Sequence, residues 1–399
     1  MEVELPFCTE LDVIPRLMAL PLKRLATQYP IVTVLGPRQA GKSTLVRGLF
    51  PEMQYVNLEA PDERRLIAAD PRGFLDNLSE QGTIIDEVQR LPDLISYLQV
   101  YVDDQGKNGQ FILTGSHQLE LHQAISQSLA GRTAILKLLP LSFSELSVSN
   151  LNSSYEEYLL SGFFPKLYQQ AIDQNKYYQD YVATYLEKDV RKMINVKDLG
   201  LFQDFLHLAA GRVGQLVSYS SMSNDLGISN HTIKQWFSVL EASFITIKLR
   251  PYFENVNKRI VKSPKIYFID PGLVCYLLGI ENKTQLLRDP LRGSIFENMV
   301  IMELVKHQYN LGKDHNLFFY RDNHQNEVDI LFKTASNLIP VEIKSAKTFD
   351  ATFIKSLKYI SGLMPDKILN GAVIYAGESK HAFQGFSVLN FLESVSAIA

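Results

Sequence analysis

The chain has 399 residues, of which 46% are hydrophobic and 21% charged, and its 40 basic and 43 acidic side chains give a net charge of −3. This length predicts about two to four domains, each with its own core. The composition excludes wholesale disorder and collagen-like repeats. The charge balance means that any contact with nucleic acid has to come from a local basic patch.

Two cysteines occur, Cys8 and Cys275, and neither lies at a metal-ligand spacing. A disulfide framework and a zinc finger are therefore not expected. No uncharged apolar run approaches the roughly 20 residues that span a bilayer. The first residues also lack the basic-then-apolar order of a signal peptide. We expect a cytoplasmic protein without a membrane partner.

The first clear element is a β-branched run at Ile31–Leu35, typical of a buried parallel strand. It leads into GPRQAGKST and then a helical segment, so a GxxxxGK[ST] motif stands between a strand and a helix. Backbone amides and a helix start favour phosphates there. The motif predicts that Lys42 reaches the β- and γ-phosphates of ATP and that Ser43 binds Mg²⁺. The predicted nucleotide-binding residues are Gly36, Arg38, Gln39, Ala40, Gly41, Lys42, Ser43 and Thr44.

Two further strands end in polar residues. The run 83–87 ends in Asp86 and Glu87. We expect Asp86 to hold Mg²⁺ through water and Glu87 to orient or deprotonate the attacking water. Adjacent acids at a strand end are often only solvated, but the upstream P-loop favours the functional interpretation. The run 110–116 ends in hydroxyls, and in an ATPase core of this order it lies between the other two strands. Ser116 or Thr114 would then polarise the water.

A helical stretch ends at Arg132 and is followed by a strand over 133–141. An arginine in this place is where an arginine finger would project toward the nucleotide of a neighbouring subunit. The prediction is then a homo-oligomer with a finger acting in trans. The alternative is an exposed arginine that the helix dipole favours.

Several segments together resemble the AAA+ ATPase superfamily: GPRQAGKST, IIDEVQRLPDL, ILTGS, AGR and PLSFSE. More narrowly, they resemble the bacterial and archaeal predicted ATPases that pair an AAA_14 domain with a C-terminal DUF4143 domain. The resemblance covers nearly the whole chain, from Arg16 to about Ser387. It implies nucleotide binding, but it does not specify a biological role.

Residues 142–198 contain few helix breakers and predict several helices, where the small lid follows in an AAA+ protein. Arg191 lies on one of them, either as a lid arginine that senses the γ-phosphate or on a solvated face. The pattern then changes to a helix, a turn at Gly227 and a second helix that Ser229 caps. Strands over 244–253 and 258–269 would form the wing of a winged helix-turn-helix.

The helix-turn-helix segment is locally basic. Between Phe205 and Lys265 there are eight Lys/Arg residues against three acids. Base contacts from the second helix and phosphate contacts from these cations would make a DNA-binding module; the alternative is a winged helix used for protein contacts or domain packing. The expected base-contacting residues are Asn230, His231, Lys234 and Gln235, and the basic residues are Arg212, Lys234, Lys248, Arg250, Lys258, Arg259, Lys262 and Lys265.

The last part begins with a helix that carries Glu297 near its start, followed by two strands joined by a polar hairpin turn. Glu342 and Lys344 are two apart and therefore share one face of the second strand. If the turn centres near residues 335–336, Asp329 falls opposite Glu342. Glu297, Asp329 and Glu342 would bind Mg²⁺ or Mn²⁺, and Lys344 would position the water or stabilise the phosphorane.

This pattern resembles the PD-(D/E)xK nuclease superfamily, a fold that often survives as a binding module. We predict an α/β chain with a P-loop AAA+-like ATPase core (1–145), a helical lid (146–200), a winged helix-turn-helix (201–262) and a restriction-endonuclease-like α/β domain (263–399). The expected function is Mg²⁺-dependent ATP hydrolysis with action on DNA. The alternatives are a nucleotide-dependent switch or scaffold that binds protein partners, and ATP binding with negligible turnover.

Overall fold

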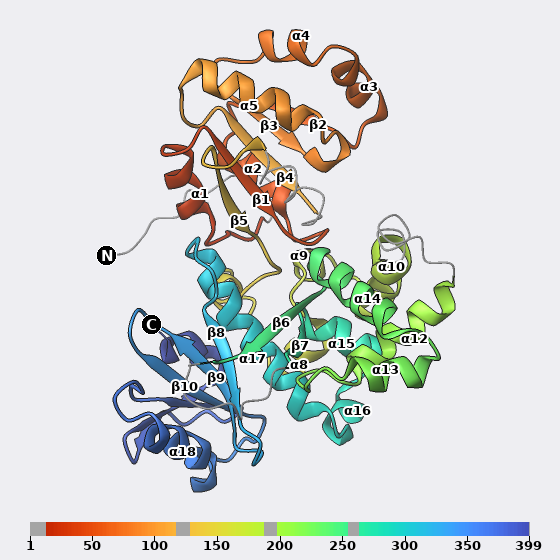
Figure 1. Cartoon of the computed structure of the whole chain (residues 1–399). Helices are drawn as coiled ribbons and strands as arrows, with labels where there is room; N and C mark the ends of the chain where they lie inside the picture. Colours follow the sequence, from red (N-terminus) through yellow and green to blue (C-terminus); the bar gives the residue numbers. More distant parts are fainter. Residues whose placement is uncertain (1–12, 117–127, 187–197, 254–262, 399) are drawn as a thin grey trace.

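The computed structural model describes residues 13–116, 128–186, 198–253 and 263–398. Its N-terminal module is a five-stranded sheet of order β2-β3-β4-β1-β5, in which every strand pair is parallel (Figure 1). As predicted, β4 lies between β3 and β1. The carboxyl ends of all five strands therefore meet at one edge of the sheet. The strands are β1 (Ile31–Leu35), β2 (Gln54–Asn57), β3 (Thr83–Asp86), β4 (Phe111–Gly115) and β5 (Thr133–Lys137).

Every residue of the central strands β1, β3 and β4 is buried, as expected for a parallel sheet that helices cover on both faces. The edge strand β5 is only partly buried. The helices of this module are α1 (Ala19–Ala26), α2 (Lys42–Leu49), α3 (Pro61–Ala69), α4 (Pro71–Asp76), the short 3-10 turn η1 (Val88–Arg90) and α5 (Leu94–Gln105).

The helices predicted as a lid pack against the C-terminal half. The ring of Tyr155 meets that of Phe296 at 5.6 Å. The buried Asp270 carboxylate accepts the Tyr178 hydroxyl at 2.6 Å and the Phe163 N–H at 2.7 Å. Arg191 lies outside the described residues. The elements are α7 (Phe143–Val148), α8 (Tyr155–Ser161), α9 (Pro165–Gln169), α10 (Gln174–Tyr181) and η2 (Val182–Leu186).

The two helices of the predicted helix-turn-helix are present as α13 (Tyr219–Leu226) and α14 (Asn230–Ala242), after α12 (Leu199–Ala210). Gly227 ends α13 at a φ of 65°, a left-handed conformation that favours glycine. The Ser229 hydroxyl caps α14 by accepting the Thr232 N–H at 3.1 Å.

The strand that follows, β6 (Thr246–Pro251), pairs antiparallel with β7 (Lys265–Phe268) and parallel with β8 (Leu317–Arg321). It therefore belongs to an eight-stranded sheet of order β12-β13-β11-β10-β9-β8-β6-β7. The predicted boundary at residues 262 and 263 falls inside this sheet, between two paired strands.

The remaining strands of this sheet are β9 (Glu327–Lys333), β10 (Leu338–Lys344), β11 (Ala372–Tyr375), β12 (His381–Phe383) and β13 (Phe386–Asn390). The helical elements in this part of the chain are α15 (Pro271–Leu277), α16 (Lys283–Arg288), α17 (Arg292–Asn310), η3 (Ala351–Ile354), α18 (Lys355–Leu363) and η4 (Phe391–Ala397). The polar turn closes β9 and β10 as predicted, because Val341 pairs with Ile330 and the next position in this register places Glu342 opposite Asp329. Among the described residues, no helix is both long and apolar enough to cross a bilayer.

Two buried charged residues on α17 contact the segment that follows β5, the edge strand of the five-stranded sheet. The Lys306 ammonium donates to the Leu141 carbonyl at 2.8 Å and lies 3.8 Å from the centre of the Phe163 ring. One oxygen of Glu303 accepts the Phe143 N–H at 3.0 Å. Its other oxygen has no hydrogen-bond partner in the described part of the chain. The junction therefore buries a carboxylate that is only half satisfied.

This arrangement predicts a pH-dependent stability. Burial raises the pKa of Glu303 to about 7, whereas the unfolded carboxyl titrates near pH 4.3. Between these values the folded chain keeps a proton that the unfolded chain has lost, so stability that is present in full at low pH falls as the pH rises. We expect Glu303→Gln, which keeps the acceptor for Phe143, to melt at a higher temperature than the wild type at pH 8 and at a similar temperature at pH 4.5.

The control is Glu52→Gln, which neutralises an exposed carboxylate and is expected to change neither melting temperature. If the difference between Glu303→Gln and the wild type is the same at pH 4.5 and pH 8, the buried Glu303 carboxylate is not the source of the pH dependence.

Candidate functional site

The P-loop connects β1 to α2 at the carboxyl edge of the five-stranded sheet. A Cβ atom at Gly36 would lie 2.0 Å from the Leu138 carbonyl oxygen, so only glycine fits there. Gln39 and Gly41 have φ angles of 62° and 90°, both in the left-handed region. The buried Lys42 ammonium donates to the carbonyls of Gly36 and Pro37, both at 3.0 Å. Lys42 therefore lies inside the P-loop in this structure, where its predicted role is to reach the β- and γ-phosphates.

Asp86, at the end of β3, is surrounded by hydroxyl groups. Ser43 donates to its Oδ2 at 2.7 Å and Tyr55 donates to the same oxygen at 2.6 Å, while Thr114 donates to Oδ1. Ser43 and Asp86 supply the hard oxygen atoms that Mg²⁺ prefers. This donor set fits the predicted Mg²⁺ site. Burial lowers the pKa of Lys42, and the nearby Glu87 and Asp86 carboxylates oppose this effect. A phosphate bound beside Lys42 would likewise favour its ammonium form.

Glu87 lies beside this group and is held by two donors. Its Oε2 accepts the Ser116 hydroxyl at 2.9 Å and the side-chain amide of Gln89. Its N–H donates to the Thr114 hydroxyl at 3.1 Å. The structure therefore brings together Asp86, Glu87, Thr114 and Ser116 as predicted, with Ser116 bound to Glu87 itself.

Arg38 and Thr44 differ in burial, since Arg38 is half-buried in the P-loop. Thr44 is exposed on the first turn of α2. The Arg38 guanidinium is 4.0 Å from the Glu59 carboxylate, which also pairs with Arg90 at 3.2 Å. A phosphate at the loop would compete with Glu59 for Arg38.

Arg132 lies at the opposite edge of the sheet. Its carbonyl accepts the N–H of Ile31, the first residue of β1, so the five residues of β1 separate it from the P-loop, about 17 Å at 3.3 Å per residue. The guanidinium pairs with Asp103 through two hydrogen bonds of 2.6 and 2.8 Å. A finger role for Arg132 therefore requires the nucleotide of a neighbouring subunit.

Glu297 is not free for a metal ion in this structure. It accepts the hydroxyl of Tyr267 and pairs with the buried Lys265 ammonium at 3.3 Å, and Lys265 pairs in turn with Glu327. Burial raises the pKa of Glu297 to about 7, against the lowering effect of Lys265. Burial disfavours the Lys265 ammonium, but the carboxylates of Glu297, Asp329 and Glu327 outweigh it and raise the pKa of Lys265.

Asp329 and Glu342 lie on neighbouring strands, as the register predicts. Asp329 accepts the N–H of Ile343 at 2.8 Å, and Glu342 accepts the Ser356 hydroxyl at 2.5 Å. Lys344 pairs with Glu342 and lies 4.0 Å from Asp329. Burial and the nearby Asp329 carboxylate raise the pKa of Glu342 to about 8.

The four predicted residues of the C-terminal site thus lie in one region. Its carboxylates, however, already form ion pairs with Lys265 and Lys344. Within the described ranges, no three His, Cys, Asp or Glu side chains form a group that could hold a metal ion as it stands. The metal site at Glu297, Asp329 and Glu342 stays a prediction, and binding would require these side chains to exchange their lysine partners for the ion.

The predicted base-contacting residues of α14, Asn230, His231, Lys234 and Gln235, are all exposed. The basic surplus around them is smaller than the sequence count indicates. Lys265 lowers it, because this lysine is buried and pairs with Glu297 and Glu327, which lie outside the counted segment. Arg212 and Lys248 pair with Asp225 and Glu241, two acids that the count already includes. Counting Lys265 as a surface cation was wrong, because its side chain is buried and its ammonium pairs with Glu297 and Glu327. Lys258, Arg259 and Lys262 lie outside the described residues.

Comparison with known proteins covers most of this chain. An AAA domain model (AAA_14) matches residues 28–147, and two models of domains of unknown function, DUF8612 and DUF4143, match residues 152–284 and 292–393. Over 366 residues the chain is 31% identical to the uncharacterised protein Rv2008c of Mycobacterium tuberculosis, spanning 90% of this chain and 79% of that protein. The chain belongs to the AAA_14–DUF4143 family.

Further similarities are weaker. An uncharacterised protein of Haemophilus influenzae is 25% identical over 350 residues, which cover 78% of this chain and 82% of that protein. Among solved structures, the Walker-type ATPase PABY2304 of Pyrococcus abyssi is 17% identical with a TM-score of 0.45, over 67% of this chain and 96% of that chain.

Three polar residues of this AAA_14–DUF4143 protein escaped the sequence prediction. Tyr55 and Gln89 are described above. The third, Arg16, is buried and donates to the carbonyls of Ala40 and Leu139, both at 2.6 Å, and to the Glu145 carboxylate at 3.0 Å. Arg16 therefore holds the P-loop through the backbone carbonyl of Ala40. None of the three lies in the GxxxxGK[ST] motif, and their partners are known only from the fold.

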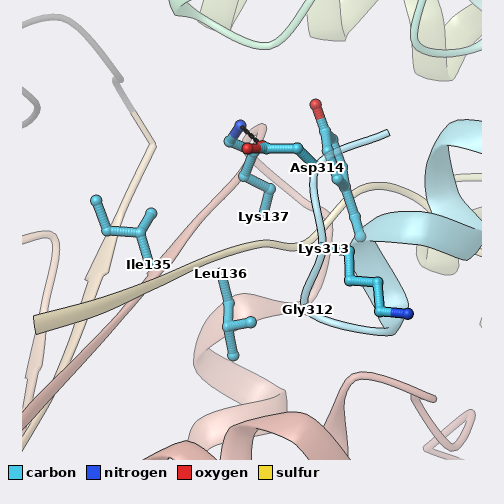
Figure 2. Close-up of a pocket in the computed structure, with 7 residues that line it drawn as sticks. Ile135, Leu136, Lys137, Gly312, Lys313 and Asp314 are labelled. Carbon is cyan, nitrogen blue, oxygen red and sulfur yellow. Dashed lines mark hydrogen bonds and ion pairs between the residues drawn. The ribbon is translucent and has the colours of Figure 1, made fainter. Parts of the chain in front are cut away.

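A small pocket of the AAA_14–DUF4143 protein lies where β5 meets the end of α17 (Figure 2). Lys137 pairs there with Asp314 at 3.2 Å and lies 5.0 Å from the centre of the Tyr309 ring. The pocket contains none of the predicted site residues. It is lined by Ile135, Leu136, Lys137, Tyr309, Gly312, Lys313 and Asp314.

Proposed function

We propose that this protein binds ATP with Mg²⁺, hydrolyses it in the cytoplasm and acts on DNA through its helix-turn-helix and its nuclease-like C-terminal domain. The observation that carries the ATPase part is the convergence of Ser43 and Thr114 on Asp86, beside a P-loop whose lysine is buried. The matching AAA domain supports the same conclusion.

Each residue of the proposed ATP site has one task. The backbone of residues 36–41 and the start of α2 would receive the phosphates, and Lys42 would leave the carbonyls of Gly36 and Pro37 for the β- and γ-phosphates. Ser43 and Asp86 would hold Mg²⁺, which neutralises charge on the phosphates when bound. Glu87 would accept a proton from the attacking water or orient it.

One experiment tests the ATPase and DNA parts together. The purified full chain is incubated with ATP, Mg²⁺ or Mn²⁺, and linear, circular or single-stranded DNA, and phosphate release and DNA integrity are followed in parallel. Phosphate release that needs the divalent ion supports the ATPase. Its absence under all conditions would contradict the proposed hydrolysis and favour a protein that only binds ATP.

The DNA part predicts salt-dependent binding through the exposed face of α14. Affinity should fall steeply as the salt concentration rises. The logarithm of the association constant falls by about 0.9 for each tenfold rise in salt concentration and each phosphate contact. We expect Lys234→Ala to weaken binding to DNA of any sequence. The control is Lys176→Ala, which removes an exposed lysine on α10 that pairs with Asp180. Equal affinity of wild type and Lys234→Ala at low salt would remove α14 from the interface.

The C-terminal site predicts stabilisation by a divalent ion, because a ligand that binds only the folded state raises stability by RT ln(1 + [L]/Kd). We expect Mn²⁺ to raise the melting temperature of the full chain in an Asp86→Asn background, in which the ATP site is disabled. Asp329→Ala in that background should lose the increase. If Mn²⁺ leaves both variants equally unchanged, Glu297, Asp329 and Glu342 do not form a metal site.

A second candidate is a nucleotide-dependent switch or scaffold that binds protein partners. Two observations favour it: Lys265 and Lys344 already pair with the carboxylates of the C-terminal site, and β6 ties the helix-turn-helix to the C-terminal sheet. A protein of this kind would hydrolyse ATP without binding DNA even at low salt.

A further inference from the structure

A closed hydrogen-bonded group surrounds the carboxylate of Glu87. We infer that Gln89 is a positioning residue for ATP hydrolysis, which together with Ser116 fixes the Glu87 carboxylate with one oxygen tied and the other available to the attacking water. This inference rests on the proposed function, because it assigns a task to a residue that acts only through Glu87.

The backbone of Glu87 is the first observation. Its φ and ψ angles of 55° and 48° lie in the left-handed region, which is uncommon for a residue other than glycine, asparagine or aspartate. The Glu87 N–H donates to the Thr114 hydroxyl at 3.1 Å, and Thr114 also donates to Asp86. The main chain at Glu87 is therefore held in an unusual conformation by the strand that lies next to it.

The side chains give the second observation. The Gln89 amide nitrogen donates to Oε2 of Glu87 and to the Ser116 hydroxyl, the latter at 3.1 Å, and Ser116 donates to the same Oε2 at 2.9 Å. Both donors thus meet one oxygen. Among the described residues, no hydrogen bond ties the other oxygen, Oε1, of Glu87, so its lone pairs are available for a proton.

Gln89 itself is the third observation. The residue is only 8% exposed, and its side-chain oxygen, Oε1, has no hydrogen-bond partner within the described ranges. A buried unpaired acceptor is costly. The unpaired oxygen is present although it is unfavourable, and the nitrogen of the same side-chain amide donates to Glu87. A leucine at this position would fill the space without an unpaired oxygen, so the amide serves its contacts with Glu87 and Ser116.

The two donors come from separate elements, which explains how they could fix the carboxylate. Ser116 follows β4 and Gln89 lies on η1 after β3, two strands that pair in parallel. A general base has to lie within hydrogen-bond reach of the water, and misplacement by about 1 Å can cost about a hundredfold in rate. Loss of Gln89 would leave the Ser116 hydroxyl to hold Oε2 without the second donor, so the Glu87 carboxylate would be oriented less firmly.

The test compares Gln89→Leu with Gln105→Leu, a matched control at an exposed position at the end of α5. We expect Gln89→Leu to lower kcat by about 10- to 100-fold, with KM for ATP and the ATP-dependent rise in melting temperature close to wild type. Gln105→Leu should match the wild type in all three. Gln89→Glu keeps the shape but lacks the N–H donor, and its kcat should fall at least as far.

A double-mutant cycle separates positioning through Glu87 from any other role. In a Glu87→Gln background, Gln89→Leu should not lower the residual rate further, because the carboxylate that Gln89 would position for proton transfer is already absent. A wild-type kcat in Gln89→Leu and Gln89→Glu, or a further loss in the Glu87→Gln background, would overturn the inference. A wild-type rate in Glu87→Gln alone would instead overturn the proposed function of Glu87.

Discussion

Glu87→Gln is expected to bind ATP as tightly as the wild type and to hydrolyse it at a rate reduced by about a hundredfold or more, in the range of a lost general base. The variant keeps the size of the side chain and the acceptor for Ser116 and Gln89, but it has no carboxylate to take a proton. ATP-dependent shifts in melting temperature measure binding, and phosphate release measures turnover.

Lys42→Ala is expected to lose ATP binding, the step that precedes hydrolysis. Lys42 is the charged group of the P-loop, buried beside the carbonyls of Gly36 and Pro37, and its loss removes the point charge that reaches the phosphates. The variant should show no ATP-dependent shift in melting temperature at ATP concentrations that saturate Glu87→Gln. Hydrolysis by Glu87→Gln at the wild-type rate, or tight ATP binding by Lys42→Ala, would contradict the assigned roles.

Arg132→Ala should bind ATP normally and hydrolyse it about a thousandfold more slowly, the lower end of the range for an arginine finger. Because Arg132 lies at the far edge of its own sheet, its target would be the nucleotide of a neighbouring subunit. Mixing Arg132→Ala with Lys42→Ala should therefore restore part of the activity, since one subunit supplies the finger and the other the intact site.

The ion pair with Asp103 provides the control for this prediction. Asp103→Asn removes the partner but leaves the guanidinium in place, so it should hydrolyse ATP close to the wild-type rate if Arg132 acts as a finger. An equal loss in Asp103→Asn and Arg132→Ala would show that only the ion pair matters. A wild-type rate in Arg132→Ala would remove the finger altogether.

Local sequence was sufficient where the partners of a residue are close in the chain. The strand at Ile31–Leu35, the P-loop and the helix after it follow one another directly. The structure has the strand at the predicted residues and the helix at Lys42–Leu49, starting within the P-loop motif. The hairpin of β9 and β10 is likewise local, because a short polar turn fixes which residues face each other. The predicted juxtaposition of Asp329 and Glu342 follows from that register.

Long-range partners could not be predicted in this way. Arg16 and Glu145 are 129 residues apart in the chain, and neither lies in a motif that names the other. Lys265 was counted with the surface cations of the helix-turn-helix. Its strand packs against α17, and its ammonium forms ion pairs with Glu297 and Glu327. Hydrophobic periodicity indicates which face of an element is buried, but not which charge meets it there.

The strand β6 has a consequence for any attempt to divide this protein. By chain order it follows the helix-turn-helix, but in space it lies between β7 and β8. A chain that began at residue 263 would leave one edge of β7 and one edge of β8 with rows of unpaired N–H and C=O groups, which readily pair with other chains. A piece ending at residue 262 would carry β6 without either neighbour. We therefore expect both fragments to aggregate, and insertions or deletions to be tolerated outside this shared sheet rather than at the boundary that the sequence indicates.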